Sequence, residues 1–254
     1  MVLGAQLYTV RELIQTPEGI ESTLKKIAEI GYTTVQVSGI GKIEPEKLRA
    51  ICDRLGLKIV ITHTSPDRIL EEPEAVISDH RILGCDLIGI GSMPGKYGFT
   101  VEGVKKFIGD YLPVAKIIAK NGMRLMYHNH NMEFERIGGK MILDMLAEGF
   151  DSELLGFTLD TYWVQAGGAD PAEYLEKLSS RVPAVHLKDM GYRNSKKGQI
   201  MCPVGEGNIN WNRIIHACEK AGAKWALVEQ DVCEEDPLIC LKKSFEYLHG
   251  QNLK

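Results

Sequence analysis

The chain has 254 residues, of which 44% are hydrophobic and 25% are charged, and its formal net charge is −4 at pH 7. This composition is typical of one large α/β domain or two small ones with an ample core. Lys and Arg are interspersed with Glu and Asp rather than gathered into a basic patch, so we expect no nucleic-acid partner. No stretch is long and apolar enough to cross a membrane, which argues against a membrane partner.

The expected compartment follows from the N-terminal residues and the cysteines. The chain starts without the basic residues and the continuous apolar run of a signal peptide, and charged side chains occur by Arg11. None of the six cysteines forms a Cys-x-x-Cys pair, and we interpret them as reduced structural thiols. We therefore expect a cytoplasmic protein.

Short apolar runs rich in β-branched residues recur along the chain, and each is followed by a loop and an amphipathic stretch. These runs predict eight strands. In chain order they are Leu3–Tyr8, Thr33–Val37, Lys58–Thr62, Leu87–Gly91, Arg124–His128, Gly156–Asp160, Ala184–Lys188 and Trp225–Glu229.

The amphipathic stretches predict eight helices. Pro begins several of them, where its missing N–H costs no hydrogen bond, and Gly follows several of them, as a left-handed C-cap requires. In chain order they are Pro17–Ile30, Pro45–Leu55, Glu72–Leu83, Val101–Asn121, Lys140–Ala147, Pro171–Leu178, Trp211–Ala221 and Pro237–Leu248. One segment, Gly191–Asn208, is expected to be a mobile loop.

Eight β-then-α units without a break in composition predict a single α/β domain over residues 1–254, folded as a (β/α)8 TIM barrel rather than an open doubly wound sheet. The chain has no Gly-x-Gly-x-x-Gly after the first strand and no Walker-type loop, so dinucleotide binding loses its usual support. In such a barrel the active site forms at the carboxyl ends of the strands. The residues at those ends are therefore the candidates for chemistry.

Side chains able to bind a metal follow four of the predicted strands: Glu133, Asp160, His186 and Glu229. In a closed parallel barrel these strand ends converge on one point. Carboxylates favour Mg²⁺ or Mn²⁺, and one imidazole shifts the preference toward Mn²⁺, Co²⁺ or Zn²⁺. Each residue also has a structural explanation when taken alone, namely a helix N-cap for Asp160, a core histidine for His186 and a Lys188 ion pair for Glu229. Four such strand ends together are hard to explain by packing.

The end of the fifth strand leaves the fourth ligand open. His128 and His130 share one face of the strand, whereas Glu133 lies beyond it and depends on the path of the loop. Either a histidine or Glu133 could bind the metal. We favour Glu133 and expect the two histidines to form hydrogen bonds to a substrate.

Other strand-end residues are candidates for contacting the substrate. Gln6 and His63 follow the first and third strands. Lys188 lies on the same side of its strand as His186 and could stabilise an oxyanion or act as a base, unless a salt bridge occupies it. Trp163 follows the sixth strand and could form an apolar wall for a sugar ring.

Five motifs together make nearly the whole chain similar to the xylose isomerase-like TIM barrels, a group often called sugar phosphate isomerases/epimerases. The resemblance implies a divalent metal, commonly Mn²⁺, with Mg²⁺, Co²⁺ or Zn²⁺ as alternatives, held by Glu133, Asp160, His186 and Glu229. The motifs are His128-Asn129-His130-x-x-Glu133-Phe134, Leu159-Asp160-Thr161-x-Trp163, Gly168-x-Asp170-Pro171, His186-Leu187-Lys188-Asp189 and Gly205-Glu206-Gly207.

The resemblance also implies a reaction. It predicts a metal-dependent isomerase or epimerase that acts on a ketose or a related keto-sugar or polyol through an enediolate, with Glu133 and Glu229 on opposite faces of the substrate. The run His128-Asn129-His130 departs from the ketose epimerases, which carry a Glu on this strand, and is similar to inosose dehydratases and lyases of 3-keto-glycosides. In that alternative, His130 or Lys188 is the base. A third alternative is a sugar-binding subunit without catalysis.

The expected partner is a small sugar or polyol. No Gly-rich cradle and no Arg cluster follows the seventh and eighth strands, so a neutral keto-sugar or polyol is favoured over a sugar phosphate. A homo-oligomer is allowed by the sequence without being specified by it.

Overall fold

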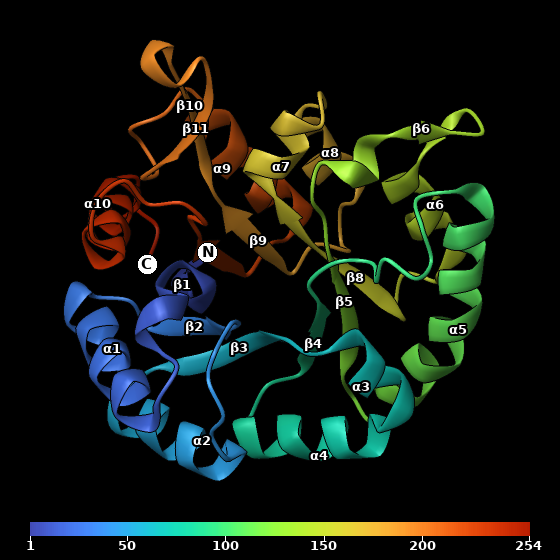
Figure 1. Ribbon diagram of the computed structural model, residues 1–254, viewed down its shortest axis with the longest axis horizontal. Helices are drawn as coiled ribbons and strands as arrows, with labels where there is room; N and C mark the ends of the chain where they lie inside the picture. Colours follow the sequence, from blue (N-terminus) through green and yellow to red (C-terminus); the bar gives the residue numbers. More distant parts are fainter.

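A computed structural model describes all 254 residues, and its central feature is a closed barrel of eight parallel strands with helices around the outside (Figure 1). The predicted (β/α)8 barrel is therefore confirmed. The order of the strands around the barrel is β1-β12-β9-β8-β5-β4-β3-β2. Their bounds are β1 Val2–Gln6, β2 Thr34–Val37, β3 Lys58–His63, β4 Leu87–Ile90, β5 Arg124–His128, β8 Leu155–Asp160, β9 Ala184–Leu187 and β12 Trp225–Val228.

All eight predicted strands are present, with small shifts at their ends. The largest concerns the first strand, which ends at Gln6 because the Gln6 side chain accepts a hydrogen bond from the Tyr8 N–H and caps the 3₁₀ helix η1 (Leu7–Leu13). That turn places the Gln6 side chain at the carboxyl end of the barrel.

The eight predicted helices are also present. The fifth begins at Ile142 instead of Lys140, because Lys140–Met141 (β7) pairs with Arg136–Ile137 (β6) in a short hairpin. Their bounds are α1 Pro17–Ile30, α2 Pro45–Arg54, α4 Pro73–Leu83, α5 Val101–Lys120, α6 Ile142–Gly149, α8 Pro171–Lys177, α9 Trp211–Ala221 and α10 Pro237–Gly250. None of the helices has the length and apolar character needed to cross a membrane.

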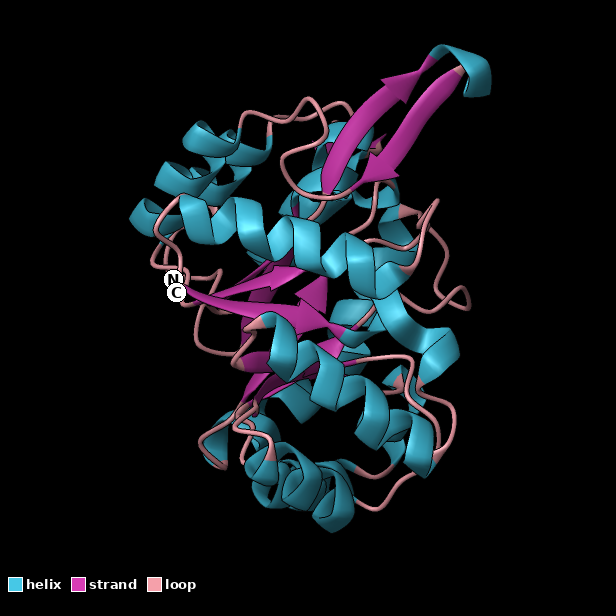
Figure 2. Cartoon of the chain, turned by 90° about the vertical axis from the view of Figure 1, so that its left-hand side faces the viewer, coloured by secondary structure: helices cyan, strands magenta, loops and turns pink.

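The structure corrects the expectation that Gly191–Asn208 is a mobile loop. Most of this segment is an antiparallel hairpin of β10 (Asp189–Arg193) and β11 (Gly198–Cys202), joined by the 3₁₀ turn η3 (Asn194–Lys196). The hairpin projects from the barrel (Figure 2). Much of it is exposed, so the chain carries little of the apolar alternation that reveals a half-buried strand.

Three further short elements follow barrel strands and had no counterpart among the predicted helices. They are α3 (Pro66–Glu71), the 3₁₀ turn η2 (Met132–Phe134) and α7 (Thr161–Ala166). Asp160 ends β8 and also caps α7, since its Oδ1 accepts from the Trp163 N–H at 2.9 Å. The N-cap role that the sequence suggested for Asp160 is thus present, but it occupies only one of the two carboxylate oxygens.

The barrel interior is apolar beneath the polar strand ends. Met126, Ala184 and Leu227 are fully buried and belong to one small cluster. Each lies two residues before a polar side chain at the end of its strand, and therefore on the same face. The polar groups therefore lie directly above a buried apolar layer, where an unpaired charge would destabilise the fold.

Candidate active site

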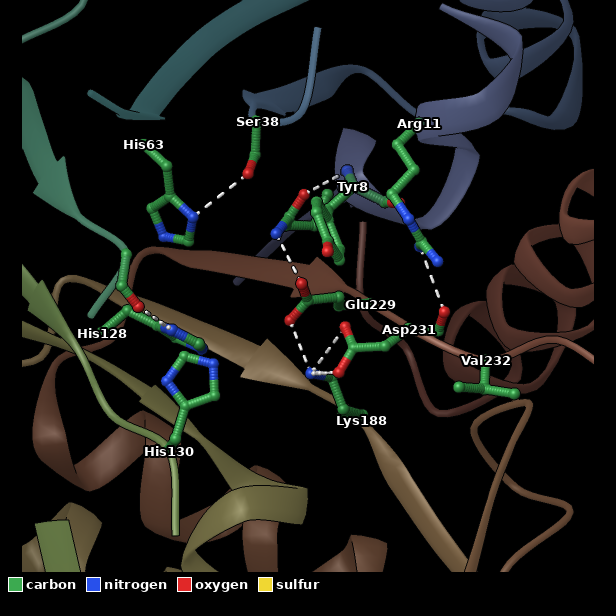
Figure 3. A pocket seen from close by; sticks show the side chains of 12 residues that line it. Tyr8, Arg11, Ser38, His63, His128, His130, Lys188, Glu229, Asp231 and Val232 are labelled. Carbon is green, nitrogen blue, oxygen red and sulfur yellow. Dashed lines mark hydrogen bonds and ion pairs between the residues drawn. The ribbon is translucent and has the colours of Figure 1, made fainter. Parts of the chain in front are cut away.

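A cavity of about 340 Å³ opens at the carboxyl ends of the barrel strands (Figure 3). The sequence placed candidate residues at this end because parallel strands bring their carboxyl ends together. The structure brings several of these side chains together around the cavity, although Glu133 is not among them. The lining includes Gln6, His63, His128, His130, Lys188, Glu229 and Asp231.

Four buried side chains at the end of this cavity could hold a metal ion: His128, Asp160, His186 and Glu229. Each offers one ligand atom, and these four atoms lie within 4.8 Å of one another. They come from the ends of β5, β8, β9 and β12. The parallel register of β8 and β9 pairs Asp160 directly with His186.

The two histidines of this group are oriented by oxygen acceptors behind them. The Nε2 of His186 lies 2.7 Å from Oε1 of Gln36, and the Nδ1 of His128 lies 2.9 Å from the Gly91 carbonyl oxygen. Because both partners can only accept, these nitrogens carry the hydrogens. The other nitrogens face Asp160, at 3.7 Å from His186 and 3.5 Å from His128, and in the neutral rings that bind a metal these nitrogens carry the lone pairs. Metal-binding histidines are held in this way.

The donor set also contains two buried atoms without a hydrogen bond. Nδ1 of His186 and Oε2 of Glu229 are 2.9 Å apart without hydrogen-bond geometry, and the Lys188 ammonium forms an ion pair with the same oxygen at 2.9 Å. The other oxygen of Glu229 accepts from the Gln6 amide at 2.6 Å. Buried polar atoms without a hydrogen bond of good geometry are rare. A divalent cation would satisfy both, so the residues present fit a metal.

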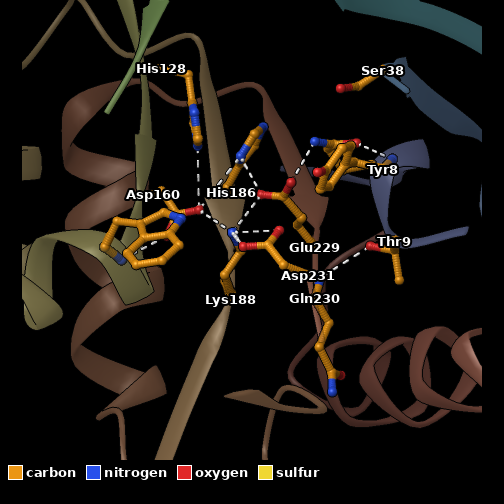
Figure 4. A network of polar contacts seen from close by, with 12 residues as sticks. Tyr8, Thr9, Ser38, His128, Asp160, His186, Lys188, Glu229, Gln230 and Asp231 are labelled. Atoms are coloured by element: carbon orange, nitrogen blue, oxygen red, sulfur yellow. Dashed lines mark hydrogen bonds and ion pairs between the residues drawn. The ribbon is translucent and has the colours of Figure 1, made fainter. Parts of the chain in front are cut away.

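Positive charge from the chain balances these carboxylates (Figure 4). The fully buried Lys188 ammonium lies 3.0 Å from Asp160, 2.9 Å from Glu229 and 3.0 Å from Asp231. Burial alone lowers the pKa of Lys188, but the three carboxylates outweigh it and hold that pKa above its usual value. Likewise burial lowers the pKa of His186, and the carboxylates of Glu229 and Asp160 raise it to about 9.

The two carboxylates respond in the opposite direction. Burial raises the pKa of Asp160 and of Glu229, but the Lys188 ammonium and the neighbouring histidines outweigh burial and hold both below their usual values. Both carboxylates are therefore ionised at neutral pH. The centre is thus a cluster of paired charges in a dry environment.

Glu133 lies outside this group, which corrects its expected position beside the other three candidates. Its two carboxylate oxygens accept from the Tyr127 hydroxyl at 2.6 Å and from the His130 N–H at 2.8 Å, and its side chain is fully buried. The 3₁₀ turn η2 directs it back toward β5 instead of toward the cavity. His128 stands where Glu133 was expected.

The remaining predicted residues lie in or beside the cavity. His63 forms a hydrogen bond of 3.2 Å to Ser38 through Nδ1, and its Nε2 has no partner. The His130 ring lines the cavity without a side-chain hydrogen bond and packs against Trp163 at 5.3 Å between ring centroids. Burial, followed by the charge of His128, lowers the pKa of His130 to about 4. A neutral His130 can accept a proton.

Sequence reasoning missed two residues that shape the site. Asp231 pairs with Lys188, and the two-residue spacing from Glu229 could have indicated it. Gln36, which orients His186, comes from the opposite side of the barrel, 150 residues away in the chain. Its position within the short strand β2 gave no sign of that partner.

Known proteins resemble this chain over most of its length. An inosose dehydratase of Geobacillus kaustophilus is 24% identical over 90% of this chain and 86% of its own length. A second inosose dehydratase, from Clostridium beijerinckii, is 28% identical over 60% of this chain and 54% of its own length. A solved structure described as a sugar phosphate isomerase/epimerase from Parabacteroides distasonis superposes with a TM-score of 0.83 at 23% identity, over 97% of this chain and 92% of that one.

The structural likeness agrees with the fold described above. The sequence profile of the xylose isomerase-like TIM barrel family matches residues 24–244, which is most of the chain. The chain belongs to the xylose isomerase-like TIM barrel family.

Proposed function

We propose that this protein is a metal-dependent lyase that removes water from a keto-polyol or keto-sugar by β-elimination. The coarser statement, that the chain has the fold and buried His/Asp/His/Glu group of the family's sugar enzymes, rests on the family match and the geometry. The choice of dehydration over isomerisation is our inference from the cavity.

The proposed ligands are His128, Asp160, His186 and Glu229. Two imidazoles and two carboxylates shift the preference further from Mg²⁺ than the set expected from the sequence, toward Mn²⁺, Co²⁺ or Zn²⁺. Mn²⁺ remains our first choice. A bound divalent cation would withdraw charge from a substrate carbonyl and so acidify the neighbouring C–H bond.

The observation that carries the proposal is the position of Glu133. Isomerisation and epimerisation by the route that the resemblance implies use two glutamates on opposite faces of the substrate. Here Glu229 lines the cavity, but both oxygens of Glu133 are occupied by Tyr127 and the His130 backbone. The His130 imidazole lines the cavity and can act as a single base there. One base that removes a proton suits elimination.

His130 is the better of the two predicted bases. Its ring lines the cavity and forms no side-chain hydrogen bond in the chain, whereas Lys188 is held by three carboxylates. We propose that His130 takes the proton next to the carbonyl, the electron pair forms a carbon–carbon double bond, and the β hydroxyl leaves. The proton on His130 then passes to the departing hydroxyl, so that the products are an enone and water.

The likeness to inosose dehydratases supports this reading. At 24% identity over 90% of the chain it does not identify the substrate, but it favours cyclic keto-polyols as the first compounds to test. Isomerisation or epimerisation of a keto-sugar stays as a second candidate, because the ionised Glu229 lies at the cavity wall, where one carboxylate could move a proton between neighbouring carbons.

The deciding experiment incubates the Mn²⁺-loaded protein with a panel of inososes, ketoses and 3-keto-glycosides in D₂O. Dehydration predicts an enone, which is detected by its ultraviolet absorbance. After return to H₂O its mass should be about 18 units below that of the substrate, which corresponds to one water lost. Deuterium uptake without loss of a leaving group would instead favour isomerisation. Binding without either change would indicate a sugar-binding subunit. His130→Gln should retain metal and lose turnover, with exposed His216→Gln as the matched control.

A further inference from the structure

The Lys188 ammonium occupies a position facing the proposed ligand atoms themselves (Figure 4). It lies 3.0 Å from Oδ2 of Asp160, the oxygen that both histidines face, and 2.9 Å from Oε2 of Glu229. These are the oxygens that converge with the histidine nitrogens in the four-residue group. The chain therefore supplies a cation of its own to the same atoms.

This position of the Lys188 ammonium has electrostatic consequences both before and after a metal binds. Without a metal, two buried carboxylates need a positive partner, because an unpaired buried charge is strongly destabilising. With a divalent cation on the same oxygens, a fixed ammonium a few ångströms away repels it strongly in a dry site. The ammonium must therefore move away or weaken the binding of the metal.

Asp231 offers the ammonium another partner. Both of its oxygens already lie near the Lys188 Nζ, at 3.0 and 3.2 Å, and its side chain is 20% exposed toward the cavity. The carbonyl oxygen of Asp231 is in turn held by the Arg11 guanidinium at 3.1 Å. A small rotation of the Lys188 side chain would leave it paired with Asp231 alone.

We propose that Lys188 is an internal counter-cation of the metal centre, which forms ion pairs with Asp160 and Glu229 before a cation binds and then pairs with Asp231 alone. This inference rests on the proposed metal centre and adds to it a positioning pair. Lys188 and Asp231 thereby have opposite effects on metal affinity, although neither is a ligand.

The test is a titration of the metal-free full-length protein with Mn²⁺ by isothermal titration calorimetry. Lys188→Met should tighten Mn²⁺ binding about tenfold, because a repelling charge is removed, and Asp231→Asn should weaken it about tenfold, because the ammonium loses its second partner. The matched controls are Lys106→Met and Glu235→Gln, which remove exposed charges without contacting Lys188.

A double variant separates this role from a general effect of charge. If Asp231 acts through Lys188, Asp231→Asn changes the Mn²⁺ affinity little when it is added to Lys188→Met. An equal loss in both backgrounds overturns the inference, as does weaker binding by a folded Lys188→Met. Thermal unfolding checks the fold, and Asp231→Asn alone remains decisive if Lys188→Met does not fold, since unchanged affinity contradicts the proposal.

Failure of the underlying metal centre has a different signature. In that case the wild-type protein and every variant bind no Mn²⁺, Co²⁺ or Zn²⁺, and both proposals are overturned together. Tight binding by the wild type combined with the wrong sign for Lys188→Met overturns only the role of Lys188.

Discussion

The ring of His186 is held from across the barrel by Gln36, whose Oε1 lies 2.7 Å from the His186 Nε2. This contact selects the tautomer in which Nδ1 points its lone pair at Asp160 and Glu229. Gln36→Leu should therefore weaken Mn²⁺ binding about 10-fold to 100-fold, as expected for the loss of a group that orients a ligand. Calorimetry on the metal-free protein measures this change.

The exposed Gln199 provides the matched control for Gln36, since Gln199→Leu removes an amide far from the centre in the chain's projecting hairpin. If Gln36→Leu binds Mn²⁺ as the wild type does, the tautomer of His186 is not set by this contact.

Replacing Glu133 should separate stability from metal binding. The amide of Glu133→Gln has only one acceptor oxygen, so either the Tyr127 hydroxyl or the His130 N–H loses its acceptor, which should lower the free energy of unfolding by about 1–3 kcal/mol. Urea unfolding of the metal-free protein measures this. Mn²⁺ affinity should stay near the wild-type value, whereas Glu229→Gln should lose most of it. A large loss of Mn²⁺ binding in Glu133→Gln would return Glu133 to the ligand set.

His80 should make stability depend on pH. It is buried, with Nε2 2.8 Å from the Thr62 hydroxyl and Nδ1 2.7 Å from the Val76 carbonyl oxygen. Burial, more than any other factor, lowers the pKa of His80 in the folded protein. Below about pH 6.5, the pKa of an unfolded histidine, the unfolded state therefore binds more protons than the folded state. His80 leaves the free energy of unfolding unchanged well above that pH and lowers it as the pH falls.

The measurement for His80 is urea unfolding of the metal-free protein between pH 7.5 and pH 5, a window of roughly one unit or more on each side of the unfolded pKa. The wild type should lose more stability across this range than His80→Gln. The exposed His216→Gln serves as the control and should follow the wild type. Parallel curves for the wild type and His80→Gln would contradict the prediction.

Asp189 should be essential for the order of the loop after the projecting hairpin. Its buried carboxylate accepts from the N–H groups of Gly205 at 2.9 Å and Gly207 at 3.1 Å, and from the Trp211 indole at 2.7 Å. Asp189→Asn turns one acceptor oxygen into a donor that faces these donors, and should cost about 2 kcal/mol or more. Faster hydrogen exchange at Gly205 and Gly207 and a shifted Trp211 fluorescence spectrum report the loss. Unchanged exchange would show that other contacts order this loop.

The division between sequence and structure is clearest at the end of β5. Strand periodicity and the closing of parallel strands predict which residues reach the carboxyl end of the barrel, and Asp160, His186 and Glu229 were placed there on that basis. Glu133 follows β5 by a turn, and a turn has no periodicity from which its direction can be read. The 3₁₀ geometry of η2 sends Glu133 to Tyr127 and leaves His128 to face Asp160.

The sequence by itself therefore determined the barrel and three of the four residues of the proposed metal centre, because these depend on patterns repeated within each β/α unit, and its motifs carried the resemblance to the family. Only the tertiary structure decided the fourth residue and the partners of the charged groups. Gln36 with His186, and Lys188 with Asp231, join segments 150 and 43 residues apart. Such pairs depend on how strands and loops meet in space, and no local pattern in the chain encodes that meeting.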